Sequence, residues 1–329
     1  MNATEPKSAA LIVGCGYLGQ RVANAWVANG RRVFALTRSR SAELAKLGIE
    51  PIVGEVLDLA SLTPLPEVGV VLYAVGLDRR AGGSMRDVYV QGLENVLKVV
   101  RCTGPILYVS STGVYGQTDG EWVDEASETN PLEESGKVVL DAEAMLRKHR
   151  PDAVVLRFAG IYGPDRVLRK QALSNGEPLV GDAEKWLNLI HVHDGRDTVI
   201  AAEGKAQPGE TYLIADDEPV SRRAFYTQAA EILGGPSAAF APGTTTSATV
   251  KEANRRIRNA KAKWNSILCR SSRHSAKDYV TRSVRASRRI RIRSLTTSAT
   301  CPLCSRSRKT SGSPRIRSLT TSATKLFFT

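Results

Sequence analysis

Three glycines near the amino terminus have the spacing of a turn that can hold phosphate groups. The segment GCGYLG, residues 14–19, follows an apolar run directly and has the pattern G-x-G-x-x-G. Gly14 would permit a tight turn, Gly16 would let the backbone approach a pyrophosphate, and Gly19 would allow close packing of a following helix. The phosphates would rest on the N-terminus of that helix. The predicted dinucleotide-binding residues of this turn are Gly14, Gly16, Tyr17, Leu18 and Gly19.

The residues after the next apolar run bear on the choice of dinucleotide. Thr37, Arg38, Ser39 and Arg40 follow the run RVFAL, and none of them is acidic. An acidic side chain here would accept hydrogen bonds from the ribose 2′-hydroxyl of NAD, whereas a guanidinium suits a 2′-phosphate. We therefore expect Thr37 and Arg38 to lie at the adenosine ribose and NADP to be preferred, with NAD as the alternative.

These motifs must be positioned by an alternation of short apolar runs and segments with helical spacing. The runs AALIV, RVFAL, VGVVLYAV, PILYVS and AVVLRF are aliphatic with little alternation, which is typical of strands buried on both faces. Residues 17–30 and 87–100 place apolar side chains on one helical face, and the first of these segments ends at Gly30, a suitable cap. The pattern predicts the α/β class and a doubly wound parallel sheet with helices on both faces.

Composition divides the chain into three parts. We expect residues 1–160 to form the dinucleotide-binding domain and residues 161–264 a small C-terminal substrate lobe, which shares a sheet edge with that domain. The lobe contains a strand-like TYLIAD, a helix in SRRAFYTQAAEILGG and a basic helix candidate at residues 251–264. Residues 265–329 form a basic tail rich in Ser, Thr and Arg, for which disorder is predicted.

Six motifs occur in a consistent order over residues 9 to about 235, namely GCGYLG, YAVG, YVQGLENVL, SSTGVYG, LRFAGIYGPDR and NLIHVHD. Together they resemble the extended short-chain dehydrogenase/reductase superfamily, and within it the NAD-dependent epimerase/dehydratase family. The resemblance implies a Rossmann domain, a nicotinamide cofactor and a substrate cleft under a small C-terminal lobe. It also implies that Glu55, with the Val56 backbone, lies beside the adenine, although an exposed loop carboxylate is an equal alternative. Ala74, Val75 and Gly76 are the further cofactor residues that it implies.

Catalysis in this family uses a Ser or Thr after the fifth strand and a Tyr-x-x-x-Lys pair on the next helix. Ser111 of SSTGVYG matches the first member. The family's helix pattern lies over SGKVVLDAE with Gly136 and Glu143 in register, which puts Ser135 at the tyrosine and Val139 at the lysine. The resemblance therefore implies that the usual proton-transfer pair is missing.

The chemical consequence follows from what the lysine does. A lysine one helical turn from a phenol lowers the phenol's pKa, and Val139 brings no charge to that place. Lys137 is two residues along, roughly 200° around the helix from Ser135, so it points to the opposite side. Tyr115 and Tyr162, in turns near the carboxyl edge of the sheet, are alternative proton donors. The predicted catalytic candidates are Ser111, Tyr115 and Ser135.

His191, His193 and Asp194 could suggest a metal site, since residues i and i+2 of a strand face the same side. No third ligand can be identified, so we predict no metal. The five cysteines are odd in number and scattered, no secretory leader precedes them, and no apolar run approaches the ~20 residues of a membrane span. A cytoplasmic protein without a membrane partner is therefore expected.

The excess positive charge lies entirely in the C-terminal part. Residues 251–329 hold 21 Lys and Arg against two acids, whereas the rest holds 25 basic and 31 acidic residues. The sequence RIRSLTTSAT occurs at residues 291–300 and again at 315–324. A shifted or extended reading frame after residue 264 would produce such a tail. We expect nucleic-acid binding only through this charge, without specificity, because aromatic stacking residues are nearly missing.

These observations predict an NAD(P)-dependent oxidoreductase or epimerase that acts on a small carbonyl or nucleotide-linked sugar. A non-catalytic NAD(P)-binding sensor or binding module is the alternative, favoured by Ser135 and Val139. The sequence leaves the oligomeric state open between a monomer and a homodimer, in which helix pairs such as residues 87–100 and 135–148 would form the dimer face, as they do in similar proteins.

Overall fold

The computed structural model describes residues 8–63, 65–78, 82–164, 166–242 and 252–268. Its centre is a parallel sheet in which seven of the described strands have the order β12-β7-β5-β4-β1-β2-β3. The order reverses between β1 and β4, which is the topological switch point of a doubly wound sheet. The strands are β1 (Ala10–Val13), β2 (Val33–Thr37), β3 (Glu50–Val53), β4 (Val70–Tyr73), β5 (Ile106–Ser111), β7 (Val154–Phe158) and β12 (Thr211–Ile214).

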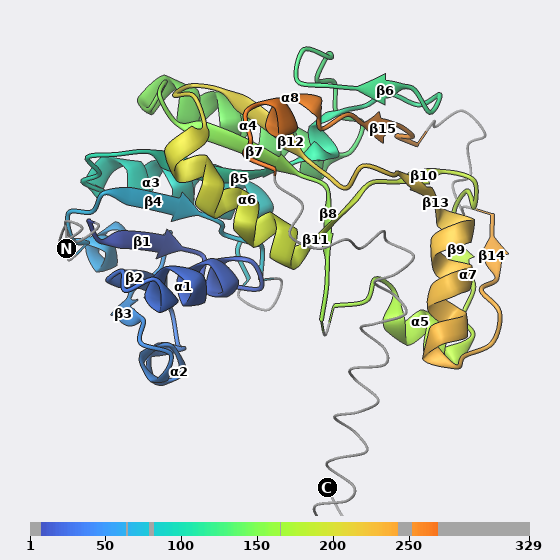
Figure 1. Ribbon diagram of the computed structural model, residues 1–329, viewed down its shortest axis with the longest axis horizontal. Coiled ribbons are helices and arrows are strands. Elements are labelled where there is room, and N and C mark those ends of the chain that lie inside the picture. Colours follow the sequence, from blue (N-terminus) through green and yellow to red (C-terminus); the bar gives the residue numbers. More distant parts are fainter. Residues whose placement is uncertain (1–7, 64, 79–81, 165, 243–251, 269–329) are drawn as a thin grey trace, which may run out of the picture. The chain divides into compact units, whose positions relative to one another are not determined.

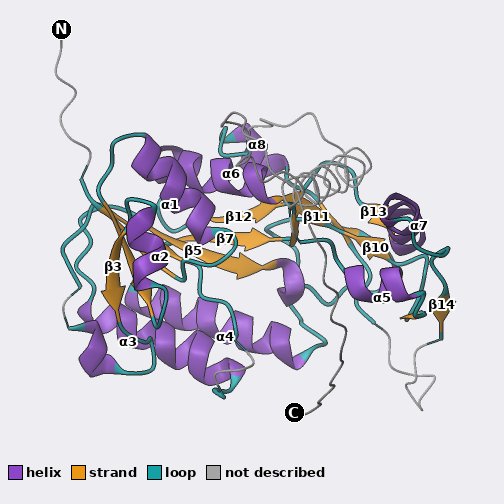
Figure 2. Cartoon of the chain, turned by 90° about the horizontal axis from the view of Figure 1, so that it is seen from below, coloured by secondary structure: helices purple, strands orange, loops and turns teal. Residues whose placement is uncertain are grey.

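Helices cover both faces of this sheet (Figure 2). Alternate residues of β1 point to opposite faces, so that Ile12 packs with α1 and α6 while Leu11 packs with α3 and α4. Burial on both faces explains why the strands are continuous aliphatic runs, and it confirms the predicted fold class. The helices and short helical turns of this part are α1 (Gly19–Ala28), α2 (Ser41–Lys46), η1 (Leu59–Leu62), η2 (Asp87–Gln91), α3 (Gly92–Val99), η3 (Thr112–Val114), α4 (Glu134–His149) and α6 (Val192–Lys205).

A smaller group of elements lies beyond the carboxyl ends of the strands, on the right in Figure 1. It has its own core, in which Tyr162, Leu189 and Phe225 are buried together. Its main helix begins where Ser221 Oγ accepts a hydrogen bond from Ala224 N at 3.1 Å, and it ends at Gly234, whose φ is 69°. The elements are β8 (Gly160–Tyr162), α5 (Lys170–Asn175), β9 (Leu179–Val180), β10 (Trp186–Leu187), β11 (Leu189–His191), β13 (Val220–Ser221), α7 (Arg222–Leu233) and β14 (Phe240–Ala241).

The prediction of a basic helix at residues 251–264 is wrong for most of this segment. Residues 256 and 257 form β15 (Arg256–Ile257), which pairs in parallel with β6 (Trp122–Val123), and only α8 (Ala260–Trp264) is helical. Arg256 N donates to Glu121 O at 2.8 Å and Arg258 N donates to Val123 O at 2.9 Å. These partners lie more than 130 residues earlier, so tertiary hydrogen bonds override the local helical preference of the segment.

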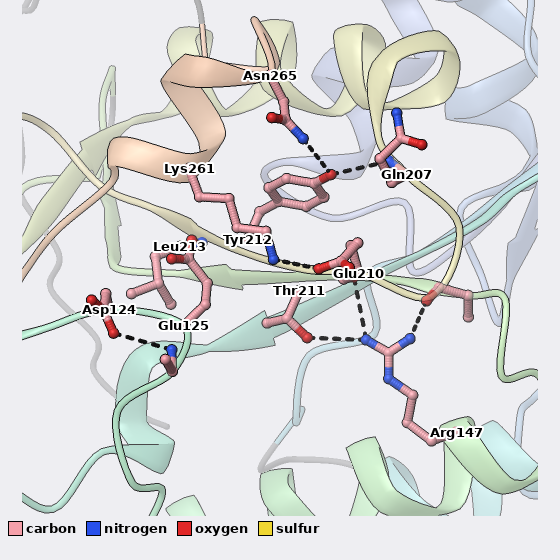
Figure 3. Close-up of polar contacts among 12 residues, drawn as sticks. Asp124, Glu125, Arg147, Gln207, Glu210, Thr211, Tyr212, Leu213, Lys261 and Asn265 are labelled. Atoms are coloured by element: carbon pink, nitrogen blue, oxygen red, sulfur yellow. Dashed lines mark hydrogen bonds and ion pairs between the residues drawn. The ribbon is translucent and has the colours of Figure 1, made fainter.

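Helix α8 is attached to the edge strand β12 by polar contacts (Figure 3). The Tyr212 hydroxyl accepts hydrogen bonds from Asn265 Nδ2 at 2.9 Å and from Gln207 N at 3.0 Å. Lys261 forms an ion pair with Glu210 in the same region. The C-terminal end of the described chain therefore covers the outer strand of the sheet.

Ordered packing continues past residue 264, where the tail was expected to begin. Ile267 and Leu268 are buried in the same core cluster as α1 and α6, with exposed fractions of 0% and 8%. Two residues assigned to the tail thus contribute apolar side chains to the core, while the bounds of the tail stay a prediction. The repeats, Cys301, Cys304 and 15 of the 21 Lys and Arg counted after residue 250 lie in residues 269–329, outside the described residues. Among the described helices, none combines the length and the apolar character needed to cross a bilayer.

Candidate functional site

The glycine turn between β1 and α1 has the geometry that its sequence predicts. Gly14 has a φ of 97°, and a Cβ there would lie 2.4 Å from the carbonyl of Ala74. A Cβ on Gly19 would lie 2.4 Å from the Gly14 oxygen, so close packing requires glycine at both positions. A Cβ on Gly16 would have nothing within 4 Å. The backbone at Gly16 is thus open to an approaching group, which is what a bound pyrophosphate needs.

A cleft of about 390 Å³ opens at the carboxyl ends of β1, β2, β3 and β4. It lies at the switch point of the sheet, where open α/β proteins bind ligands. The predicted residues that line it are Gly14, Gly16, Thr37, Arg38, Glu55, Val56, Ala74, Val75 and Gly76.

The other members of the glycine turn lie behind the cleft. Leu18 and Gly19 are buried against the sheet. The Tyr17 hydroxyl donates to Pro164 O at 2.8 Å, and the guanidinium groups of Arg21 and Arg166 lie 4.0 and 5.2 Å from its ring centre. Tyr17 therefore connects the turn to the loop after β8.

Two arginines at the end of β2 have different surroundings. Arg38 lines the cleft, with Nη2 2.6 Å from Asp78 Oδ2 and Nη1 3.7 Å from Glu55 Oε1. Arg40 instead donates to Cys15 O at 2.8 Å and forms an ion pair with Glu43, which fixes it against the glycine turn. Arg38 is thus the guanidinium whose partners, both partly exposed carboxylates, a ligand phosphate could displace.

Glu55 and Val56 stand at the same edge of the cleft. Glu55 N donates to Ser61 Oγ at 2.9 Å, and its carboxylate is turned toward Arg38. Val56 O accepts from Asn95 Nδ2 at 3.0 Å, and its side chain packs against Gly92. The loop after β3 is therefore held by the start of α3.

A second pocket, of about 270 Å³, lies at the end of β5. Since β5 pairs in parallel with β4, both pockets are at the same edge of the sheet. Thr112, Gly113 and Ser135 line this pocket, together with Arg255. Ser111 stands at its turn, where its Oγ accepts a hydrogen bond from Gly113 N at 3.0 Å. The two predicted serines are therefore at or next to one pocket.

Neither Val139 nor Lys137 on α4 replaces the missing lysine beside Ser135. Val139 is 6% exposed and packs in a core cluster with Val114 and Tyr115. Lys137 is exposed and lies 3.6 Å from the Glu134 carboxylate on the outer side of α4. Helix α4 thus presents the apolar Val139 to the core at the position that corresponds to the family's lysine.

The two alternative tyrosines use their hydroxyls in structural hydrogen bonds. Tyr115 is fully buried; its hydroxyl donates to Asp124 O at 2.9 Å and accepts from Arg157 Nη1 at 2.8 Å. Burial raises the pKa of Tyr115. The Tyr162 hydroxyl lies 3.0 Å from Asp216 Oδ2. Tyr115 also lines the second pocket, so its role as a proton donor stays a prediction, although its hydroxyl is already used in two hydrogen bonds.

The strand interpretation of residues 191 to 193 is wrong. His191 ends β11 and His193 is already in the first turn of α6, where its N–H donates to His191 Nδ1 at 3.3 Å. The two rings meet edge to face with their centres 4.9 Å apart. The described residues contain no group of three or more side chains arranged to hold a metal ion.

Sequence reasoning missed two features of this site. Asp78 follows β4 and pairs with Arg38, and only the strand order brings these residues together. Arg255 reaches the second pocket from the segment that was expected to be helical. Neither has a local sequence signal.

Three known proteins illustrate what the chain is similar to. It is 27% identical over 248 residues to 4-hydroxy-2-methyl-3-oxo-4-farnesyl-3,4-dihydroquinoline-1-oxide ketoreductase of Stigmatella aurantiaca, covering 67% of this chain and 72% of that protein. It is 26% identical over 248 residues to 2-alkyl-3-oxoalkanoate reductase of Stenotrophomonas maltophilia, covering 68% and 74%. The fold matches dTDP-glucose 4,6-dehydratase of Streptomyces venezuelae, solved with NAD and TYD bound, with a TM-score of 0.73, 20% identity and coverage of 86% and 98%.

The sequence model of one protein family matches a long, continuous part of this chain. This model, of the NAD dependent epimerase/dehydratase family, matches residues 10–215, from β1 to the end of β12. The match covers more than half of the sequence and agrees with the parallel sheet and the glycine turn. The chain therefore belongs to the NAD-dependent epimerase/dehydratase family.

Proposed function

We propose that this protein is an NAD(P)-dependent oxidoreductase that acts on a small carbonyl compound. The observation that carries the proposal is the cleft at the switch point of the sheet. In its glycine turn, the backbone at Gly16 is accessible to a ligand, whereas Gly14 and Gly19 are packed against protein backbone. The names of two relatives, a ketoreductase and an oxoalkanoate reductase, support carbonyl chemistry over sugar epimerisation.

Within this proposal, residues 1–160 hold the cofactor and residues 161–264 complete the substrate site. The bound nicotinamide nucleotide supplies or accepts the hydride. The backbone at Gly16 binds the pyrophosphate, and Ser111 and Ser135 orient the carbonyl by hydrogen bonds at the second pocket. Position 139 carries a buried, apolar valine and no lysine that could assist proton transfer from α4, so water delivers the proton and turnover is slow.

NADP is the cofactor that the charges of the cleft favour. Calorimetry with NADPH and NADH would test this. Replacing Arg38 by Gln should weaken NADPH binding at least about 10-fold and leave NADH binding unchanged, because a charge-assisted contact to a 2′-phosphate is lost. Asp78→Asn is the matched control, since it removes the partner of Arg38 and should not weaken NADPH binding. Equal losses for both nucleotides in Arg38→Gln would contradict the assignment.

A cofactor sensor without turnover is the second candidate. It is favoured by the burial of Val139 and by the structural hydrogen bonds of the Tyr115 hydroxyl. NADPH oxidation against a panel of aldehydes, ketones and oxo acids separates the two functions. Turnover that is lost in Ser111→Ala and retained in Ser174→Ala, an exposed serine on α5, supports the enzyme. Tight NADPH binding with no oxidation supports the sensor.

A further inference from the structure

Arg255 enters the second pocket from a segment whose backbone is held on two sides. Asn254 N donates to Gln117 O at 2.7 Å, and Gly120 N donates to Asn254 O at 2.9 Å. On the other side, the Asn188 amide donates to Arg255 O at 2.8 Å and accepts from Ile257 N at 2.8 Å. The backbone that carries this guanidinium is therefore fixed, although it belongs to no long strand or helix.

The guanidinium has few partners for a charged group in this position. Its Nη2 donates to Thr112 O at 2.6 Å, one residue after Ser111. Its Nε is shielded from solvent and has no hydrogen-bond partner. Within the described chain no carboxylate lies within ion-pair distance of it, and desolvation lowers the pKa of Arg255. A desolvated charge without a counter-ion is unfavourable, so the position of this guanidinium at a pocket points to a ligand that pairs with it.

Arg157 provides a contrast within the same molecule. Arg157 is buried, whereas Arg255 is half-buried; the Nη2 of Arg157 lies 2.6 Å from Glu143 Oε2 and its Nε lies 3.0 Å from Glu143 Oε1. The fold therefore supplies a counter-ion for the arginine that serves the core. It supplies none among the described residues for Arg255, the arginine that lines a pocket.

The rest of the pocket leaves the charge of Arg255 largely uncompensated. Lys185 also lines it, but its ammonium is paired with Glu252 at 3.0 Å. Glu133 is the acid of the lining, and its side chain is exposed at the start of α4. Ser135 and Asn188 are neutral. One half-buried guanidinium, whose Nε is shielded from solvent, therefore faces a pocket of about 270 Å³ that is large enough for a small organic anion.

We propose that Arg255 binds the carboxylate of the substrate, so that this protein acts on small oxo acids whose carbonyl lies at Ser111 and Ser135. The inference rests on the proposed oxidoreductase function and names its substrate class. A carboxylate carries one negative charge and matches a single guanidinium, whereas a phosphate ester carries nearly two and would favour a second unpaired cation. Arg255 is a binding and specificity residue in this scheme, and it transfers no proton.

Steady-state kinetics with matched substrates would test the proposal. The probes are 3-oxohexanoate and its methyl ester, with dihydroxyacetone phosphate and dihydroxyacetone as the phosphate pair, each with NADPH. We expect the acid to have the lower KM. Arg255→Gln should raise the KM for the acid at least about 30-fold and leave the ester unchanged, since a charge-paired hydrogen bond is lost. Arg258→Gln, an exposed arginine three residues along, should change neither.

Binding measurements keep this test separate from the test of the proposed function. If no carbonyl is reduced although NADPH binds, the oxidoreductase proposal fails, and calorimetry of 3-oxohexanoate with the NADPH-loaded protein still decides the role of Arg255. Binding to the wild type and not to Arg255→Gln would support it. Thermal unfolding provides a check on folding, because Arg255→Met should be as stable as the wild type or more stable without ligand. Equal KM or Kd values for acid and ester, or preference for the phosphate, would overturn the proposal.

Discussion

A buried ion pair joins strand β7 to helix α4. Arg157 on β7 binds Glu143 on α4, and Glu143 also accepts from the Ser110 hydroxyl on β5 at 2.5 Å. Arg157 donates in addition to the Tyr115 hydroxyl. The glutamate that aligns with the family's helix pattern is therefore part of a buried network that positions α4, the helix that carries Ser135.

Breaking this pair should be strongly destabilising. Glu143→Gln is expected to lower the free energy of unfolding by about 3 to 5 kcal/mol, because it leaves the Arg157 charge buried without a partner. The exposed pair Arg32 and Glu50 is the control, and Glu50→Gln should cost less than about 1 kcal/mol. Urea unfolding followed by circular dichroism measures both. Similar losses in the two variants would show that the buried pair has no special role.

A second buried carboxyl gives the stability a pH dependence. Burial is the main cause that raises the pKa of Asp216 to about 7, whereas the hydrogen bond with Tyr162 acts in the opposite direction. The unfolded chain ionises this group near pH 4, so folding holds the proton more tightly. The stabilisation from Asp216 is therefore complete below about pH 4 and is lost as the pH rises through about 7. Asp216→Asn should flatten the decline in urea stability between pH 5 and 8; an unchanged slope would show that other groups cause it.

At the scale of elements, the turn between β1 and α1 needs glycine for two different reasons: Gly14 and Gly19 for packing, and Gly16 for ligand binding. Gly14→Ala and Gly19→Ala should destabilise the fold, because each added Cβ meets backbone atoms at 2.4 Å. Gly16→Ala should fold normally, since its Cβ meets no protein atom, and should weaken NADPH binding at least about 10-fold by blocking the phosphates. Melting temperatures and calorimetry distinguish the two effects. Unchanged binding in a well-folded Gly16→Ala would remove the phosphate-binding role of this turn.

The elements also show how far the sequence could be interpreted. The strands β1, β2 and β4 and the turn at Gly16 were predictable because local spacing determines them. The position of Arg255 was not, since β15 is defined by hydrogen bonds to a segment more than 130 residues away. The hydrogen bond between the Tyr115 hydroxyl and Arg157 could not be predicted either, because the two residues come together only through the pairing of β5 with β7.

At the scale of the whole molecule, charge and fold are separated along the sequence. Residues 269–329 carry 15 Lys and Arg against one acid, so a chain that ends at residue 268 would have a net charge of −1 instead of +13. The described core is complete at Leu268, which packs with α1 and α6. Truncation after residue 268 should therefore keep the melting temperature and NADPH affinity, whereas truncation after residue 259 should lower both by removing α8 and Ile267.

The same truncation tests the only expected contact with nucleic acid. The full chain should bind single-stranded RNA weakly, with an affinity that falls steeply with salt, because the attraction comes from released counter-ions. The chain that ends at residue 268 should show no such binding, since its net charge is slightly negative. Fluorescence anisotropy at 50 and 200 mM salt measures this. RNA binding that persists in the truncated chain would place a nucleic-acid site on the folded domain. It would then count against the proposal that the pocket binds a small oxo acid.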